Sequence, residues 1–217
     1  MPESQRQPYF VLVRPQMGEN IGASARAMWN FGLEQMRVVA PRDGWPSTRA
    51  VAMASGAGRL LDAAQHFDGA SEAVGDASFV FATTARGRDL TKLMLAPEEA
   101  MRQAAEKIAQ GQKVAVLFGP ERAGLENEDI AGANALISVP VNPDFPSLNL
   151  AQCVLLMAYE WRRAQGKVEL ARMELAKTQW AEAIEVEKLA QHYEERLQDA
   201  GFFFPGAKAP GMKVNLR

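Results

Sequence analysis

The sequence predicts an α/β fold in which helices flank one mostly parallel sheet. Short apolar runs typical of strands alternate with stretches of helical periodicity along most of the chain, and this alternation is the pattern of parallel α/β domains. The 217 residues suit one large domain, or one ordinary domain with an appendage. Hydrophobic residues make up 47% of the chain and charged residues 23%, a composition that excludes a disordered protein.

Five apolar, β-rich runs are the predicted strands. They cover residues 9–13, 37–40, 78–82, 113–118 and 136–139. Runs that are short and continuously apolar suit strands covered by helices on both faces. Pro41 closes the second run, because proline has no backbone N–H with which to extend a strand.

The first predicted helix covers residues 20–31. Asn20 is a favourable N-cap residue, and Gly32 suits the turn that ends a helix. The apolar residues that share one face of this helix are Ile21, Ala25, Met28 and Trp29. Such a face predicts packing against the sheet.

Two longer helices are expected further along the main domain. Pro97 opens a helix that runs to residue 110, because proline is favoured at the first helical position. The other helix covers residues 148–165, and Ser147 is well placed to cap it.

The composition changes at Gly166, where a charged and weakly amphipathic stretch begins. We therefore expect a main domain of residues 1–164, followed by a linker and a partial helical extension over residues 165–217. Within the extension a helix is predicted over residues 184–200, ended by Gly201.

Several classes of protein conflict with this composition. The longest clean apolar stretch, residues 154–159, is too short to span a bilayer, and the first residues have no signal-peptide pattern. A cytoplasmic protein without a membrane partner is expected. The single cysteine, Cys153, excludes an internal disulfide, and His66 and His192 are isolated, so no metal site is expected.

The charge balance leaves the nature of the partner open. The net charge of −2 and the pI of about 5.8 argue against a uniformly basic nucleic-acid binder. Yet 16 of the 24 basic residues are arginine, the side chain best suited to phosphate recognition. Composition alone favours the alternative, in which the arginines are simply solvated charges on a soluble surface.

Two glycine-rich segments resemble nucleotide-binding loops but are incomplete. Residues 56–61 lack the third glycine of a dinucleotide fingerprint, which argues against an oxidoreductase. Residues 119–124 have the spacing of a phosphate-binding loop, but Leu125 and Glu126 replace its lysine and hydroxyl residue.

Three other segments concentrate small and polar residues at the ends of predicted elements. The segments are residues 20–26, 117–125 and 139–152. Their polar residues of interest are Asn20, Arg26, Glu121, Ser147 and Asn149. The second segment follows a buried strand, where open α/β sheets bind ligands, and the third combines a proline-stiffened loop with a helix start that can bind a polar group. The small residues of the first segment would allow a close approach to the helix. Taken singly, the first segment also suits an ordinary capped helix and the second an ordinary strand–turn–helix connection. Capping alone would explain Ser147 but not the whole third segment.

Together the three segments resemble the motifs of the SpoU/TrmH branch of the SPOUT RNA 2′-O-ribose methyltransferases. Those motifs are N-x-G-x-x-x-R, F-G-x-E-x-x-G-L and P-x-x-x-S-L-N-x-x-x-A. The matching residues are Asn20, Gly22 and Arg26, then Phe118, Gly119, Glu121, Gly124 and Leu125, then Ser147, Leu148 and Asn149. The motifs occur in order, and the resemblance covers about residues 8–163.

Finer features are most similar to the TrmJ group of this branch. They are the loop at residues 83–88, Asn142-Pro143 before the third motif, residues 158–160 in the last main-domain helix, and the helix that ends at Gly201-Phe202. The resemblance implies a sheet whose C-terminal segment forms a trefoil knot, although knots are nearly absent from proteins in general. It also implies a homodimer and S-adenosylmethionine as the cofactor. The implied reaction is methylation of a ribose 2′-hydroxyl, and the similarity to the TrmJ group places it at the first position of the tRNA anticodon loop (position 32). An rRNA ribose methyltransferase and a non-catalytic RNA-binding relative remain the alternatives.

The resemblance also assigns residues to roles. The implied catalytic residues are Arg26, Ser147, Asn149, Glu121 and Asn20. The implied cofactor-binding residues are Thr83, Thr84, Ala85, Gly119, Val139, Pro146, Ser147 and Leu148. The implied RNA-binding residues are Arg14, Arg26, Arg86 and Arg88. A guanidinium is essentially always protonated, so we expect Arg26 to stabilise a developing alkoxide and to grip phosphate. The implied dimer surface includes the apolar residues Leu150, Val154, Leu155, Met157, Ala158 and Trp161 of the last main-domain helix.

Overall fold

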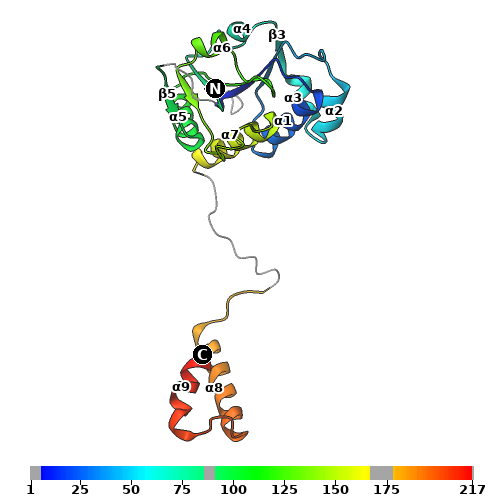
Figure 1. The fold of residues 1–217 in the computed structure, drawn as a ribbon. Coiled ribbons are helices and arrows are strands. Elements are labelled where there is room, and N and C mark those ends of the chain that lie inside the picture. The colour runs from blue at the N-terminus through cyan, green and yellow to red at the C-terminus, as the bar shows by residue number, and fades with distance from the viewer. Residues whose placement is uncertain (1–5, 86–90, 167–177, 217) are drawn as a thin grey trace. The chain divides into compact units, whose positions relative to one another are not determined.

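The structure is a computed structural model that describes residues 6–85, 91–166 and 178–216. The chain divides into two units, Met1–Val168 and Glu169–Arg217. The first unit contains a seven-stranded, wholly parallel sheet in the order β3-β2-β1-β6-β4-β7-β5. Its edge strands β3 and β5 lie on opposite sides of this unit (Figure 1). The predicted parallel α/β sheet is confirmed, while the trefoil knot stays a prediction.

The strands are β1 (Tyr9–Val13), β2 (Met36–Val39), β3 (Gln65–Phe67), β4 (Phe79–Thr83), β5 (Leu93–Leu95), β6 (Val114–Phe118) and β7 (Ala135–Ile137). The five predicted strands correspond to β1, β2, β4, β6 and β7, within one or two residues of their bounds. Sequence patterns missed β3 and β5, which are three residues long and lie at the two edges of the sheet. Three residues, mostly exposed, are too few to establish a strand period.

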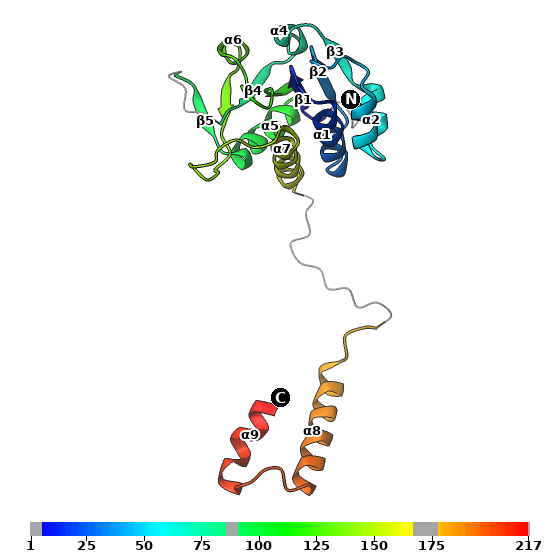
Figure 2. The ribbon, with the colours of Figure 1, turned by 45° about the vertical axis from the view of Figure 1, so that its right-hand side comes forward.

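Helices cover both faces of the sheet. One face packs against α1 (Gly18–Asn30), α2 (Thr48–Ala54), α3 (Gly58–Ala63), α5 (Pro97–Ala109) and α7 (Leu150–Ala164), and the other against α4 (Ala70–Ala73) and α6 (Asn127–Ala131) (Figure 2). Alternate residues of β1 divide between these layers, since Phe10 and Leu12 join the first core and Tyr9, Val11 and Val13 the second. All five residues of β1 are therefore buried.

Helix α1 begins two residues before the predicted start. Met17 is the N-cap, so the expectation that Asn20 caps this helix is wrong. Asn20 instead lies inside the helix with only 9% of its surface exposed, and its side chain bonds to residues of other segments. Gly32 follows the helix with a φ of +76°, as the predicted stop requires.

The small residues of α1 admit another helix rather than a ligand. A Cβ at Gly22 would lie 2.1 Å from the carbonyl oxygen of Ala50 in α2, and one at Gly18 would lie 2.3 Å from the Ser47 hydroxyl. The close approach expected from the sequence is therefore an α1–α2 contact.

Helix α7 is capped by Asn149 and not by Ser147. The Asn149 side-chain oxygen accepts a hydrogen bond from the Ala151 backbone N–H at 2.8 Å. The Gln152 side chain in turn accepts one from the Asn149 backbone N–H at 3.1 Å. Both residue types cap helices well, and this reciprocal pair decides between them. Ser147 is left available for another role.

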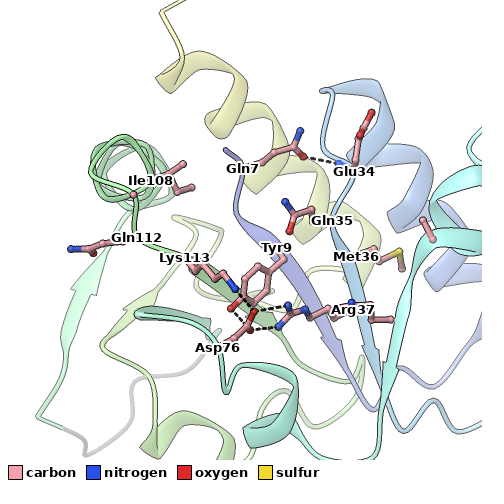
Figure 3. Close-up of a pocket in the computed structure, with 13 residues that line it drawn as sticks. Gln7, Tyr9, Glu34, Gln35, Met36, Arg37, Asp76, Ile108, Gln112 and Lys113 are labelled. Carbon is pink, nitrogen blue, oxygen red and sulfur yellow. Dashed lines mark hydrogen bonds and ion pairs between the residues drawn. The ribbon is translucent and has the colours of Figure 1, made fainter. Parts of the chain in front are cut away.

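A polar cluster joins the starts of β1, β2 and β6, beside a cavity of about 450 Å³ (Figure 3). The motif residues lie at the other end of these strands. Asp76 accepts hydrogen bonds from the Tyr9 hydroxyl at 2.9 Å, from Arg37 at 2.7 and 3.2 Å, and from Lys113 at 3.0 Å. The Arg37 guanidinium also stacks over the Tyr9 ring at 3.7 Å. Because Asp76 binds both cations and the Tyr9 hydroxyl of this cluster, we assign the cluster a stabilising role.

The second unit contains α8 (Ala183–Asp199), a short 3-10 turn (Gly206–Lys208) and α9 (Ala209–Leu216). Helix α8 confirms the predicted helix, and Gly201 ends it with a φ of +71°. Phe203 is buried within this unit, against Phe202 and Lys213.

Candidate active site

A cavity of about 270 Å³ opens where β4, β6 and β7 end. Its walls come from the loops that follow these three strands and from the start of α7. All eight residues predicted to bind a cofactor line it, namely Thr83, Thr84, Ala85, Gly119, Val139, Pro146, Ser147 and Leu148. The carboxyl edge of a parallel sheet is the usual position for a ligand site.

The loop after β6 has a tightly folded backbone. A Cβ at Gly119 would lie 2.2 Å from the backbone nitrogen of Leu125, and Gly124 has a φ of +68°. The Gly124 N–H donates to the Pro120 carbonyl at 2.9 Å. Both glycines are therefore needed for the turn itself, which presents Glu121 at the cavity.

A chain of side-chain hydrogen bonds connects the three motifs. Asn20 donates to one oxygen of Glu121 at 2.6 Å, and Asn149 donates to the side-chain oxygen of Asn20 at 2.9 Å. The second oxygen of Glu121 accepts from the Gln16 backbone N–H at 2.9 Å. The structure thus brings together three of the five predicted catalytic residues, and their bonds indicate that they orient the loops around the cavity.

Ser147 lies in the cavity wall beside this chain of bonds. Its side chain is exposed, and no hydrogen bond occupies its hydroxyl within the described residues. The hydroxyl is therefore free to bind a ligand.

Arg26 is not part of the cavity lining. It is exposed on α1, and none of the described residues pairs with its guanidinium. Arg122, which the sequence analysis did not assign to the site, does line the cavity and is likewise unpaired in the part of the chain that the structure describes. Its position directly after Glu121 was the available signal.

The predicted RNA-binding arginines have different surroundings. Arg14 forms a two-pronged ion pair with Asp129 of α6, one bond of which measures 3.1 Å, and lies 3.5 Å from Glu126. These bonds raise the pKa of Arg14 above its usual value. Its charge is therefore largely matched within the protein. Arg86 and Arg88 lie outside the described residues.

Cys153 was also missed as a residue of the cavity wall. Burial raises the pKa of its thiol to about 11, and a hydrogen bond with Thr83 opposes this shift. The thiol therefore stays protonated at neutral pH. A cysteine one turn into a helix carries no sequence signal of this kind.

Comparison with known proteins identifies the family. The model of the SpoU rRNA methylase family matches residues 7–159, well over half of the chain. The chain belongs to the SpoU methylase family. Within the described residues no helix is long and apolar enough to cross a membrane. The same residues contain no group of three or more His, Cys, Asp or Glu that could hold a metal ion.

Individual relatives carry more specific names. A tRNA (cytidine/uridine/adenosine-2′-O-)-methyltransferase TrmJ from Pseudomonas aeruginosa is 39% identical over 203 residues, which cover 90% of this chain and 79% of that protein. The crystal structure of TrmJ from Z. mobilis ZM4 is 48% identical, with a TM-score of 0.83 over 96% of this chain and 87% of that one. The resemblance to the TrmJ group is thereby confirmed.

A more distant SpoU structure shares the fold. The methyltransferase AviRb from Streptomyces viridochromogenes, crystallised with S-adenosylmethionine, is 19% identical with a TM-score of 0.58, over 75% of this chain and 59% of that one. The parallel sheet flanked by helices is thus the fold of SPOUT methyltransferases.

Proposed function

We propose that this protein transfers a methyl group from S-adenosylmethionine to a ribose 2′-hydroxyl of tRNA in the cytoplasm, at the first position of the anticodon loop. The chain of hydrogen bonds from Glu121 through Asn20 to Asn149 carries the proposal, because it joins the three family motifs at one cavity. The names of the TrmJ relatives support tRNA as the substrate.

The cavity suits the proposed cofactor. Ile137, Val139 and Leu148 offer apolar walls for a flat purine, while Ser147 offers a hydroxyl for the polar methionine end. A volume of about 270 Å³ lies just below the roughly 300–1,000 Å³ that is typical of small-molecule sites. When bound, S-adenosylmethionine supplies a methyl group already activated by a positively charged sulfur.

The protein's own groups then align and stabilise the reacting oxygen. The bound cofactor would supply the methyl group to the 2′-oxygen and keep the electron pair of the broken bond as a neutral thioether, while the 2′-hydroxyl proton would pass to water. Arg26 stabilises the negative charge that develops on that oxygen and holds a neighbouring phosphate, because its guanidinium stays protonated. Ser147 positions the hydroxyl or the cofactor, and Glu121, Asn20 and Asn149 hold the loops in place.

A homodimer would give Arg26 a role that the single chain does not. Arg26 is outside the cavity of its own chain, so a second copy of the chain would bring it to the partner's cavity. Much of the predicted dimer surface is used in the monomer core, since Leu150, Val154, Met157, Ala158 and Trp161 are buried. Leu155 remains exposed, as does Tyr159, which packs edge-on against Phe31 after α1. The dimer surface that we propose is this exposed α1–α7 face.

The substrate is tested by mapping methylated nucleotides. Unmodified tRNA and rRNA are incubated with the protein and S-adenosylmethionine, and every 2′-O-methylated position is then identified. A new methyl group on tRNA at the first anticodon-loop position is the expected result. A methyl group on rRNA alone would favour the second candidate, which the name of the family model supports. No methylation with retained RNA binding would favour a non-catalytic relative.

A further inference from the structure

Phe145 has the most exposed large apolar side chain in the described part of the first unit. Its exposed fraction is 76%, against 57% for Val51 and Leu93, which come next. Aromatic rings of this size are normally buried, because leaving them in water forgoes a large hydrophobic gain. The exposure leaves the ring available to another molecule.

The turn that presents the ring is fixed by its own bonds. The Phe145 backbone N–H donates to the Asn142 carbonyl at 3.0 Å, and the Asp144 N–H donates to the Asn142 side chain at 3.1 Å. Pro143 and Pro146 restrict the backbone on either side. The ring is therefore held outward by the backbone of the turn.

The ring is also close to the candidate active site in the chain. Pro146 and Ser147 line the cavity, and two residues of extended chain span at most about 7 Å. The loop that carries Phe145 leads from the end of β7 to the start of α7 (Figure 2). The first turn of α7 contributes Leu150 to the same wall.

We propose that Phe145 is a stacking platform for a base of the RNA substrate, next to the ribose that receives the methyl group. This inference rests on the proposed function. A loop nucleotide whose ribose enters a narrow cavity has lost stacking with its neighbours, and single-stranded bases commonly regain it on exposed aromatic side chains. Phe145 has no polar group on its ring, so the platform is expected to accept any base.

The charges around the ring fix which part of the nucleotide it binds. Asp144, directly before Phe145, is exposed and repels phosphate. Arg122 lines the cavity and is unpaired in the described part of the chain, so it attracts phosphate. The base therefore lies on Phe145, while the sugar–phosphate backbone passes on the arginine side.

The test compares Phe145→Leu and Phe145→Tyr in the full chain, with Val51→Ala as a control at another exposed apolar position. Affinity for unmodified tRNA is measured in the presence of S-adenosylhomocysteine, and KM and kcat are measured with S-adenosylmethionine. We expect Phe145→Leu to weaken tRNA binding and raise its KM by roughly 5- to 100-fold, the usual effect of losing one stacked base, with a smaller change in kcat. Phe145→Tyr and Val51→Ala should bind tRNA as the wild type does.

Three results would overturn the inference. The first is unchanged tRNA affinity in Phe145→Leu. The second is an equal loss in Phe145→Tyr, which would indicate a packing role for the exact side chain. The third is a molecular mass of Phe145→Leu in solution that differs from that of the wild type, which would show that a second copy of the chain covers the ring. Cofactor affinity, measured by calorimetry, should be the same in all variants. If the wild type binds tRNA but methylates no RNA, the proposed function fails, and the binding comparison still decides the role of Phe145.

Discussion

At the scale of single residues, the candidate site separates groups that hold the cavity from groups that are free to act. Glu121, Asn20 and Asn149 are engaged with one another. Ser147, Arg26 and Arg122 have no partner among the described residues. Sequence motifs identified five of these six, because each belongs to a family pattern. They could not separate the two classes, since hydrogen bonds between residues more than a hundred positions apart leave no local signal.

Arg26→Ala is expected to abolish turnover while S-adenosylmethionine still binds. Arg26 does not line the cavity, and losing one group that stabilises transition-state charge commonly lowers kcat by about 10²–10³-fold. Turnover is measured with unmodified tRNA, and cofactor affinity by calorimetry. Arg42→Ala, at an exposed arginine paired with its neighbour Asp43, should retain activity. Lost cofactor affinity in Arg26→Ala would contradict this assignment.

Cys153 should react slowly with thiol reagents in the folded protein. Its raised pKa of about 11 leaves roughly a hundredfold less thiolate at pH 8 than an ordinary cysteine has. Labelling with a chromogenic disulfide is compared in buffer and in urea, where the reaction should become fast. S-adenosylhomocysteine should slow it further, because Cys153 lines the cavity. Since this is the only cysteine, no other thiol contributes, and fast labelling of the folded protein would contradict the prediction.

At the scale of elements, the long continuous patterns were predicted well and the short ones were not. The buried runs of β1 and β6 and the helix opened by Pro97 were found within a residue of their bounds. Edge strands β3 and β5 were missed because they are short. The caps of α1 and α7 were misplaced, because a capping side chain chosen from sequence competes with neighbours that only the tertiary structure reveals.

The α1–α2 contact should make Gly22 intolerant of a side chain. A Cβ there would lie 2.1 Å from the Ala50 carbonyl oxygen, so Gly22→Ala is expected to destabilise the protein by about 1–3 kcal/mol through overpacking. Gly58→Ala is the matched control, because a Cβ at that helical glycine meets nothing within 4 Å and should be neutral or slightly stabilising. Urea unfolding measures both, and equal stabilities of the two variants would refute the packing argument.

The contribution of Asp76 to the free energy of unfolding should depend on pH. Hydrogen bonds from Arg37, the largest cause, and from Lys113 and Tyr9 hold the pKa of Asp76 well below its usual value. A lowered folded-state pKa gives stability that is complete above about pH 5 and declines as the pH falls below the unfolded value of about 3.9.

Asp76→Asn tests this linkage. We expect a loss of about 1–2 kcal/mol at pH 7, a modest figure because the carboxylate is 41% exposed. The difference from the wild type should stay constant between pH 5 and 7 and shrink below pH 4, as followed by denaturant unfolding. A stability difference between wild type and Asp76→Asn that grows as the pH falls would contradict a lowered pKa for Asp76.

At the scale of the whole molecule, the expected assembly is a homodimer. The sequence implied a homodimer and a knot through resemblance alone, because neither periodicity nor spacing encodes threading or a partner. Light scattering at micromolar concentration should give twice the chain mass of 23.7 kDa. Replacing exposed Leu155 by Glu should shift the mass toward that of one chain, since it places a charge in the proposed α1–α7 face. A single-chain mass for the wild type would contradict the dimer.

The hydrogen-bond chain through the motifs also has a consequence for the time course of folding. The Asn20–Glu121 bond spans 101 residues and the Asn20–Asn149 bond spans 129. Contacts of such long separation form slowly, because loop-closure entropy opposes them. During synthesis the sheet strands up to β7 can emerge and pair while the cavity is still incomplete, because Asn149 and α7 are made afterwards. Cofactor affinity is therefore expected to arise late, when the last segment docks, so that a half-made chain on the ribosome does not yet bind S-adenosylmethionine.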